Sequence, residues 1–280
     1  MGWLFTFAFS KILLIMKKRK PKVAILISTY NWPEALELVL LSILQQTQMP
    51  DEVLIADDGS KQDTQLLIER YRRKFSIPLK HAWHEDKGFR KCLILNKAIK
   101  LSEADYIIEI DGDIIINPRF VADHMKTAQK GVFVQGSRTM LTEERSKEIL
   151  QTKEISFHSL SRGVYSRFNA VRIPILSVLF RPDPRSSYNV KGCNLAFWRD
   201  DYVKINGYYN GFEGWGWEDF EFGQRLINAG ILKKRLKMAA ISYHIFHKIS
   251  SRENFLPNEL IYRETLDNKL TYRDNGYREA

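Results

Sequence analysis

Short apolar runs alternate with amphipathic segments along the first part of the chain. Residues 23–28, 52–56 and 106–110 are continuous runs rich in β-branched residues, which is typical of buried strands. Residues 34–46 and 63–75, which lie between these runs, carry leucine or isoleucine at helical spacing. Because strands that are apolar on both faces alternate with helices, the pattern predicts an α/β fold with a mostly parallel sheet and crossover helices.

The pattern is less regular in the second half. We expect further strands at residues 79–83, 132–135, 190–197 and 238–247, and further helices at residues 89–100, 137–158, 220–229 and in the tail from Glu259. Residues 161–184 contain four arginines and three prolines. Three interpretations stay open for this stretch: a mobile lid, an acceptor-side surface, or a solvated loop.

Polar side chains follow three of the predicted strands directly. They are Thr29-Tyr30-Asn31, Asp57-Asp58 and Asp111-Gly112-Asp113. In parallel sheets, ligands bind beyond the carboxyl ends of the strands. Gly112 permits a sharp turn, so the carboxylates of Asp111 and Asp113 could face one point and bind Mg²⁺ or Mn²⁺. Since Asp-Gly is also common in β-turns, a simple turn is the alternative.

Two further clusters lie near the C-terminus. Glu218 and Asp219 follow the loop Gly214-Trp215-Gly216-Trp217 and open a predicted helix. Carboxylates are favoured at the positive end of a helix, so a capping role is the alternative to a catalytic one. His244 and His247 are three residues apart and can face one side of a turn, which favours metal binding.

Composition and charge narrow the class of partner. The chain has 280 residues, 44% hydrophobic and 27% charged, and a net charge of +10. That charge suits an anionic membrane surface, a nucleotide or an acidic polymer, and no zinc-finger or RNA-binding signature indicates nucleic acid. Cys92 and Cys193 are the only cysteines, so no disulfide framework is expected and a reducing compartment is the default.

The first 20 residues differ from the rest. Residues 2–16 are mostly apolar, and Lys17, Lys18, Arg19 and Lys20 follow at once. The apolar part is short for a membrane span, and it lacks a cleavage site. We expect an in-plane or partly inserted anchor at the cytoplasmic face of a membrane. A buried first helix followed by a polar linker is the alternative.

Sugar transfer from a nucleotide donor needs the parts predicted above: a crevice, carboxylates for a metal, a separate acid and aromatic faces. No Walker lysine loop and no Gly-x-Gly-x-x-Gly is present, which argues against an ATPase or a dehydrogenase. Taken together, the motifs resemble those of the inverting glycosyltransferases of family 2, which have the GT-A fold. They are Ser28-Thr29-Tyr30-Asn31, Asp57-Asp58-Gly59-Ser60, Asp111-Gly112-Asp113, Gly214 to Asp219, and the His244/His247 pair.

The resemblance covers residues 23–254, and the C-terminal half is similar to the galactosyltransferase and chondroitin-polymerase type of domain. It implies a Rossmann-like, mostly parallel central sheet flanked by helices. The expected domains are an anchor at residues 1–20, a GT-A domain at 21–255 and a tail at 256–280. Within the GT-A domain, residues 21–118 would be the nucleotide-binding half and residues 186–250 the acceptor and catalytic half.

The resemblance also implies roles for single residues. For the nucleotide these are Thr29, Tyr30, Asn31 and Asp58 at the uridine, Asp57 near it, and Gly88, Phe89, Arg90 and Gly112 along the pocket. For the metal they are Asp113 as a direct ligand, Asp111 at ribose or metal, His247 as the late ligand and His244 as a second one. For the sugar they are Asp219 as catalytic base, Glu218 holding hydroxyls, and Gly192, Asn194 and Trp215 shaping the sites.

The expected reaction is transfer of one sugar, with inversion, from a UDP-sugar to a glycan or lipid-linked acceptor, as in surface polysaccharide synthesis. The donor would be UDP-linked galactose, N-acetylgalactosamine, N-acetylglucosamine or glucose, with Mn²⁺ or Mg²⁺ as cofactor. The Gln-x-x-Arg-Trp motif of processive synthases is missing, which favours one sugar per encounter. The alternatives are a nucleotidyltransferase and a non-catalytic carbohydrate-binding module on the same fold.

Overall fold

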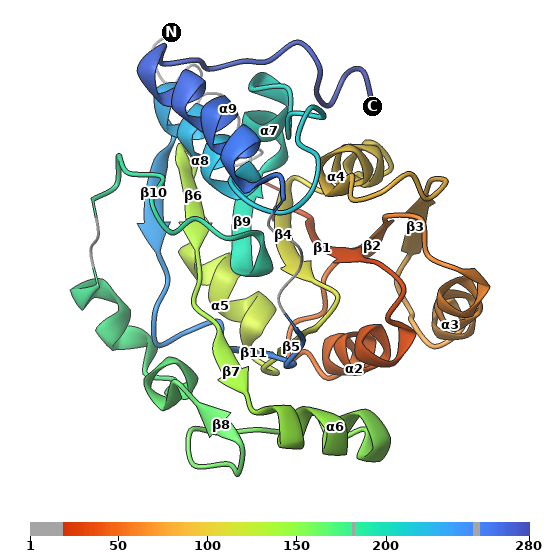
Figure 1. The fold of residues 1–280 in the computed structure, drawn as a ribbon. Coiled ribbons are helices and arrows are strands. Elements are labelled where there is room, and N and C mark those ends of the chain that lie inside the picture. The colour runs from red at the N-terminus through yellow and green to blue at the C-terminus, as the bar shows by residue number, and fades with distance from the viewer. Residues whose placement is uncertain (1–18, 181–182, 249–252) are drawn as a thin grey trace, which may run out of the picture.

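The structure, a computed structural model, describes residues 19–180, 183–248 and 253–280 (Figure 1). In chain order the elements are β1 (Val23–Thr29), α2 (Pro33–Leu44), β2 (Glu52–Asp57), α3 (Gln62–Arg72), β3 (Leu79–Trp83), α4 (Lys91–Lys100), β4 (Tyr106–Asp111), β5 (Ile114–Ile116), α5 (Phe120–Thr127), β6 (Val132–Gln135), β7 (Thr139–Leu141), α6 (Glu143–Thr152), β8 (Val164–Tyr165), β9 (Leu195–Trp198), α7 (Arg199–Lys204), α8 (Glu218–Asn228), β10 (Leu232–Arg235), β11 (Ser242–His244) and α9 (Phe255–Asp267). Three 3₁₀ helices complete them: η1 (Arg167–Ala170), η2 (Pro174–Leu179) and η3 (Gly192–Asn194).

The main sheet has seven strands in the order β10-β6-β9-β4-β1-β2-β3. β1 pairs in parallel with β2 and β4, β2 with β3, and β6 with β10. β9 alone is reversed, against both β4 and β6. The predicted α/β fold with a mostly parallel sheet is therefore confirmed. Because β9 is reversed, its first residue, Leu195, lies opposite Glu109 near the carboxyl end of β4, and this places η3 at the ligand-binding edge of the sheet.

Helices cover both faces of this sheet, and the strands supply the core of each layer by alternation. Ile25 and Ile27 of β1 pack with α2, α3 and α5, whereas Ala24 and Leu26 pack with α4, α7 and α8. Figure 1 shows α4 on one side of the strands and α2 and α3 on the other. Burial on both faces explains why these strands are continuous apolar runs in the sequence.

A smaller sheet has four strands in the order β5-β11-β7-β8. β11 runs antiparallel to β5 and pairs His244 with Ile114, the residue after Asp113. It also runs parallel to β7, where His244 pairs with Met140. The small sheet thus brings a C-terminal histidine beside the turn that follows β4.

Three of the predicted elements were wrong in part. The strand predicted at residues 190–197 is shorter, because η3 takes up residues 192–194 and β9 begins at Leu195. Residues 137–158 do not form one helix, because β7 takes up residues 139–141 and α6 begins only at Glu143. The hydroxyl of Thr142 caps α6 by accepting a hydrogen bond from the Arg145 N–H, and Lys153 ends it in a left-handed conformation. The strand predicted at residues 238–247 is limited to β11, since Met238 and Ala240 have positive φ, which interrupts an extended strand.

The two termini differ in how far the structure describes them. Most of the predicted anchor, residues 1–18, lies outside the described residues, and its membrane role stays a prediction. Arg19 at its end donates hydrogen bonds to both carboxylate oxygens of Asp105, each at 2.9 Å. No helix within the described ranges has the length and apolarity to cross a bilayer. The predicted tail helix is confirmed as α9, which begins at Phe255 and lies against α8 (Figure 1).

Candidate active site

A cavity of about 670 Å³ opens at the carboxyl edge of the main sheet. We call it the central cavity. Its walls come from the ends of β1, β2 and β4, the start of α4, the residues before β9, the loop before α8, and the region after β11. Among the described residues that line it are Thr29, Tyr30, Asp58, Phe89, Lys91, Asp111, Gly112, Asp113, Arg138, Cys193, Trp215, Glu218, Asp219, His244, His247 and Phe255. Most of the predicted site residues therefore meet in one place.

Asp58 lies at the nucleotide end of the cavity and is tied to the loop before α4. Its Oδ1 lies 2.7 Å from His84 Nε2, and its Oδ2 accepts the Arg90 N–H at 2.8 Å. Burial raises the pKa of Asp58, although His84 works against the rise, and burial lowers the pKa of His84. Nearby, the Tyr30 hydroxyl donates to Asp86 Oδ2 at 2.8 Å while half of Tyr30 stays exposed. This end thus offers an exposed aromatic ring above a fixed loop.

Four predicted nucleotide-binding residues do not line the cavity. Asp57 accepts the Ser60 N–H at 2.8 Å, and its other oxygen lies 3.0 Å from His81 Nε2. Asn31 Oδ1 accepts the Lys61 N–H at 2.8 Å. Gly88 and Arg90, like Asp57 and Asn31, are absent from the residues that line the cavity. In this structure Asp57 and Asn31 stabilise turns.

Lys91 begins α4 and points its ammonium into the cavity. The ammonium lies 2.8 Å from Asp111 Oδ1, which also accepts the Ser28 hydroxyl at 2.9 Å. Burial alone would raise the pKa of Asp111, but Lys91 and Ser28 hold that pKa below its ordinary value. Burial lowers the pKa of Lys91, yet nearby carboxylates, Asp111 and Asp219 first among them, raise it well above the ordinary value. Both groups are therefore charged at neutral pH.

Asp113, His244 and His247 form the cluster best suited to a metal. Their candidate ligand atoms all lie within 4.8 Å of one another. Nε2 of His247 is 3.2 Å, and Nε2 of His244 is 3.5 Å, from Asp113 Oδ2. The hydrogen bond to Asp113 raises the pKa of His247 to about 9, whereas burial lowers the pKa of His244.

The cluster fits a divalent cation on two counts. Asp113 Oδ1 is buried without a hydrogen-bond partner among the described residues, so an acceptor is available. One carboxylate with two imidazoles is also a donor set that a first-row divalent ion such as Mn²⁺ accepts. His247 Nδ1 lies 2.7 Å from the Lys248 carbonyl, which orients the ring and leaves Nε2 toward Asp113. Asp111 stands outside this cluster, occupied by Lys91 and Ser28.

Glu218 and Asp219 face the same cavity from the start of α8. Asp219 Oδ2 accepts the Gly192 N–H at 2.7 Å, and Glu218 Oε2 accepts the Gly216 N–H at 2.9 Å. Burial and the charge of Asp219 raise the pKa of Glu218 to about 7. Burial also raises the pKa of Asp219, against the opposing effect of Lys91. Near neutral pH this pair can hold a proton and can also accept one.

An aromatic loop closes one side of the cavity. Trp215 lies parallel to Phe255 with ring centroids 6.1 Å apart, and Trp217 stacks on Tyr262 at 5.2 Å. Trp217 has a φ of 73°, a left-handed conformation that is costly for a large side chain. Residues of α9 therefore support the loop, and Trp215, which is partly exposed, lines the cavity.

Gly192 and Asn194 both lie in η3, but they contact different parts of the protein. A side chain at Gly192 would come within 2.5 Å of Glu109 Oε1 and 2.9 Å of Asp219 Oδ1, so it would displace these carboxylates. Asn194 is fully buried away from the cavity lining. Its amide donates to the carbonyls of Ser137 and Ala240, and its Oδ1 lies 2.9 Å from His124 Nε2. Asn194 thus joins η3 to α5 and to the residues that precede β7 and β11.

Several site residues were missed by sequence reasoning. Lys91 belongs to the basic run 87–91, but nothing in that run distinguishes the buried lysine from the exposed ones. Glu109 is a carboxylate inside an apolar strand, and that was the available signal. It is fully buried, accepts the Tyr208 hydroxyl at 3.0 Å, and burial raises its pKa well above the ordinary value. Arg138 follows β6 without any local pattern.

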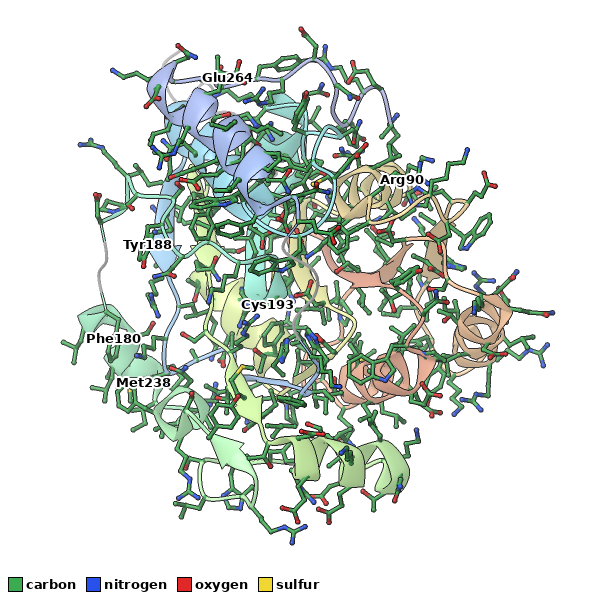
Figure 2. The ribbon with its side chains drawn as sticks, in the orientation of Figure 1. Arg90, Phe180, Tyr188, Cys193, Met238 and Glu264 are labelled. Carbon is green, nitrogen blue, oxygen red and sulfur yellow. The ribbon has the colours of Figure 1, made fainter. Side chains whose placement is uncertain are left out.

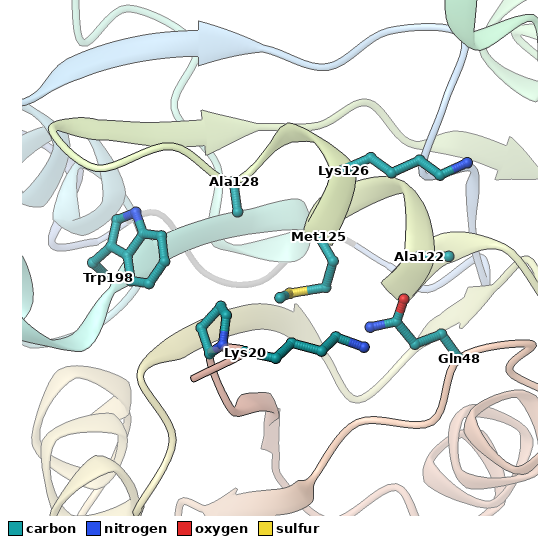
Figure 3. A pocket seen from close by; sticks show the side chains of 8 residues that line it. Lys20, Gln48, Ala122, Met125, Lys126, Ala128 and Trp198 are labelled. Carbon is teal, nitrogen blue, oxygen red and sulfur yellow. The ribbon is translucent and has the colours of Figure 1, made fainter. Parts of the chain in front are cut away.

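A second hollow of about 410 Å³ lies at the opposite edge of the sheet, where Tyr106 begins β4 opposite Trp198. Figure 3 shows Lys20, Lys126, Met125 and Trp198 around it. Its described lining includes no carboxylate, imidazole or thiol. The chemistry therefore belongs to the central cavity.

Comparisons with known proteins agree with this geometry. The family model described as glycosyl transferase family 2 matches residues 24–183, and the model described as N-terminal domain of galactosyltransferase matches residues 176–248. A hyaluronan synthase from Pasteurella multocida is 25% identical over 262 residues, which cover 88% of this chain and 26% of the relative. This chain thus spans about a quarter of that relative's length.

Solved structures share the fold at low sequence identity. A mannosyltransferase from Pyrobaculum calidifontis, in complex with GDP-Man and Mn²⁺, aligns with a TM-score of 0.58 and 17% identity, over 88% of this chain and 65% of that one. Residues 1–349 of S. aureus TarS, in complex with UDP, align with a TM-score of 0.60 and 16% identity, over 86% of this chain and 64% of that one.

Proposed function

This chain belongs to glycosyl transferase family 2, and on that premise we propose that it transfers one sugar from a UDP-sugar, with inversion, to a glycan or lipid-linked acceptor. It is a glycosyltransferase with a mixed α/β, GT-A-like fold. The UDP held by TarS and the Mn²⁺ held by the mannosyltransferase support a nucleotide-sugar donor and a divalent cofactor. The donor sugar would be galactose, N-acetylgalactosamine, N-acetylglucosamine or glucose.

One observation carries the proposal. The metal-suited cluster Asp113, His244 and His247 and the carboxylate pair Glu218 and Asp219 line the same cavity. A metal cluster alone would suit many enzymes, and a buried acid pair alone would suit many others. Their presence in one cavity matches a reaction in which a diphosphate leaves and a hydroxyl attacks.

The metal ligands and Asp219 have separate roles in the proposed reaction. A divalent cation held by Asp113, His244 and His247 would neutralise the charge that develops on the leaving diphosphate. Asp219, fixed by the Gly192 N–H, takes the proton from the attacking hydroxyl. The hydroxyl attacks the anomeric carbon from the face opposite the diphosphate, so an α-linked donor gives a β-linked product.

The remaining groups orient the sugar and the pair. Protonated Glu218 donates a hydrogen bond to a sugar hydroxyl, which its pKa of about 7 permits at neutral pH. The ammonium of Lys91 holds the pKa of Asp111 below its ordinary value and opposes the rise that burial causes in the pKa of Asp219. The exposed face of Trp215 packs against the apolar face of a sugar ring. Thr29, Tyr30 and Phe89 hold the base and ribose.

The cellular setting is part of the proposal. The net charge of +10 and the apolar, basic first 20 residues support a location at the cytoplasmic face of a membrane, with an anionic surface as partner. The acceptor would then be a growing surface polysaccharide or a lipid-linked saccharide.

The test is UDP release by the full chain. Each of the four UDP-sugars is incubated with the protein and Mn²⁺, without acceptor, so that slow hydrolysis substitutes for transfer. We expect one donor to release UDP and EDTA to abolish the release. If no donor reacts, UDP with Mn²⁺ should still raise the melting temperature, because binding precedes turnover. Absence of both effects would contradict the UDP-sugar assignment, and pyrophosphate release from a nucleoside triphosphate would indicate nucleotidyl transfer instead.

A further inference from the structure

The segment that contains η1 and η2 exposes an unusual amount of apolar surface. η2 has no buried residue, and Ile175, Val178 and Leu179 are 79%, 60% and 71% exposed. Phe168 and Ile173 are also exposed, at 51% and 42%. We call these five residues the η2 surface. Exposed apolar side chains concentrated in one short segment indicate an interaction site.

Hydrogen bonds attach the segment that carries the η2 surface to the folded domain. The Ile173 N–H donates to the Met238 carbonyl at 2.9 Å, and the Asn169 side chain donates to the Arg138 carbonyl at 2.9 Å. Figure 2 shows Phe180 and Met238 near each other at the periphery, with Cys193 of the central cavity nearer the middle. Because Arg138 also lines that cavity, the surface is joined to the cavity wall.

Cations accompany the apolar side chains. The ammonium of Lys237 lies 4.6 Å from the ring centroid of Phe168 and 5.0 Å from that of Phe180. Lys234 is exposed and Arg235 partly exposed on the adjoining edge strand, β10. Burial and the charge of Arg235 lower the pKa of Lys237, as expected where positive charges gather. From residue 160 to residue 188 the sequence has five arginines and a single acid.

We propose that the η2 surface docks onto an anionic lipid bilayer. Ile175, Val178 and Leu179 enter the boundary between headgroups and acyl chains, and Lys234, Arg235 and Lys237 meet lipid phosphates. Apolar side chains bordered by lysine and arginine are what an interfacial membrane-binding element requires. A second copy of this chain fits less well, because a symmetric contact brings the same cations of both copies into one interface.

Docking through this surface would hold the central cavity beside the bilayer. The inference rests on the proposed function only for what is gained there, namely access to a lipid-linked acceptor. The docking itself is independent of the reaction. It is also separate from residues 1–20, since the η2 surface lies on the folded domain.

A site-specific spin label tests where the bilayer touches the protein. A nitroxide is attached in the full chain at Ile175→Cys or, as a control, at Leu260→Cys on α9, where the native side chain is 68% exposed. Native Cys92 and Cys193 are buried. With vesicles containing phosphatidylglycerol, the label at position 175 should be shielded from a water-soluble relaxing agent, and the label at position 260 should not. Equal shielding at both positions, or none at position 175, would overturn the proposal. Shielding at position 175 without vesicles would also overturn it, because that indicates a protein contact.

Vesicle sedimentation of two matched double variants measures how much the η2 surface contributes to membrane binding. Ile175→Ser/Leu179→Ser should weaken binding to anionic vesicles by about tenfold or more, since two apolar side chains no longer enter the bilayer. Leu256→Ser/Leu260→Ser, which removes two leucines of similar exposure from α9, should bind as the wild type does. Equal binding by the two variants would overturn the proposal. Both should release UDP at the wild-type rate, so a failure of the proposed function is detected separately from a failure of docking.

Discussion

Lys91 Nζ lies 2.8 Å from Asp111 Oδ1, with the lysine side chain only 13% exposed. The same ammonium acts on the charges of Asp219, Glu109 and Glu218. This largely buried cation therefore offsets several carboxylates on the acidic side of the central cavity. This explains how Asp111 stays ionised beside other carboxylates that burial tends to protonate.

Replacing Lys91 by methionine should damage both stability and binding. Asp111 would lose its ionic partner, which costs up to about 3 kcal/mol for a buried pair broken on one side. UDP with Mn²⁺ should also bind more weakly, because the cavity becomes more negative or takes up protons. The measurements are the melting temperature with and without UDP and Mn²⁺. Lys126→Met, at an exposed position in the last turn of α5, is the control and should change neither. A Lys91→Met protein that matches the wild type would contradict the balancing role.

Glu218 makes the stability of the protein depend on pH. Its pKa rises from an ordinary 4.5 to about 7 on folding, so the folded state holds a proton that the unfolded state releases. The sign follows from this difference: stability falls as pH rises from about 4.5 to about 7, by about 3 kcal/mol from this group. Glu218→Gln should remove that loss. Relative to the wild type, its free energy of unfolding should therefore be higher at pH 8 than at pH 5.

Chemical unfolding at the two pH values, in EDTA, measures this difference. Glu103→Gln, an exposed glutamate, is the control and should follow the wild type. The same pH dependence in the wild type and in Glu218→Gln would show that Glu218 is not protonated in the folded state.

Mn²⁺ binding tests the cluster of Asp113, His244 and His247 without any turnover. Removing the carboxylate in Asp113→Ala should weaken Mn²⁺ binding by more than the roughly 10- to 100-fold that follows loss of a residue that only orients a ligand. Electron paramagnetic resonance of free Mn²⁺, titrated with protein and UDP, gives the affinity. Asp200→Asn, an exposed acid on α7, should bind Mn²⁺ normally. Unchanged affinity in Asp113→Ala would place the metal elsewhere.

How much of this site the sequence predicts depends on whether a residue's partners are local. Asp111 ends β4, Asp113 directly precedes β5, and Glu218 and Asp219 begin α8. All four line the central cavity, at the edge where the sequence places such ends. The contact between Asp113 and His244 was not predictable from geometry, because it depends on β11 pairing with β5. The helix predicted at residues 137–158 failed because β7 is formed by pairing with β11 and β8, which overrides local helical spacing.

Gly192 is the most sensitive support of the catalytic base. Alanine there would bring Cβ within 2.9 Å of Asp219 Oδ1 and within 2.5 Å of Glu109, and would displace the carboxylate from the Gly192 N–H. We expect Gly192→Ala to lower kcat by about tenfold or more, since small misplacements of a reacting group are costly. UDP binding, which uses the other end of the cavity, should change little. A parallel loss of UDP binding in Gly192→Ala would indicate a general packing defect.

The most direct test of the account is Asp219→Asn in the full chain, measured for UDP binding and for sugar transfer. The change keeps the size of the side chain and an oxygen that can accept the Gly192 N–H, but it removes the base. We predict that the rise in melting temperature with UDP and Mn²⁺ remains nearly that of the wild type, while transfer falls by about 10²- to 10⁴-fold. Transfer at the wild-type rate, or equal loss of binding and transfer, would contradict Asp219 as the catalytic base of this glycosyltransferase.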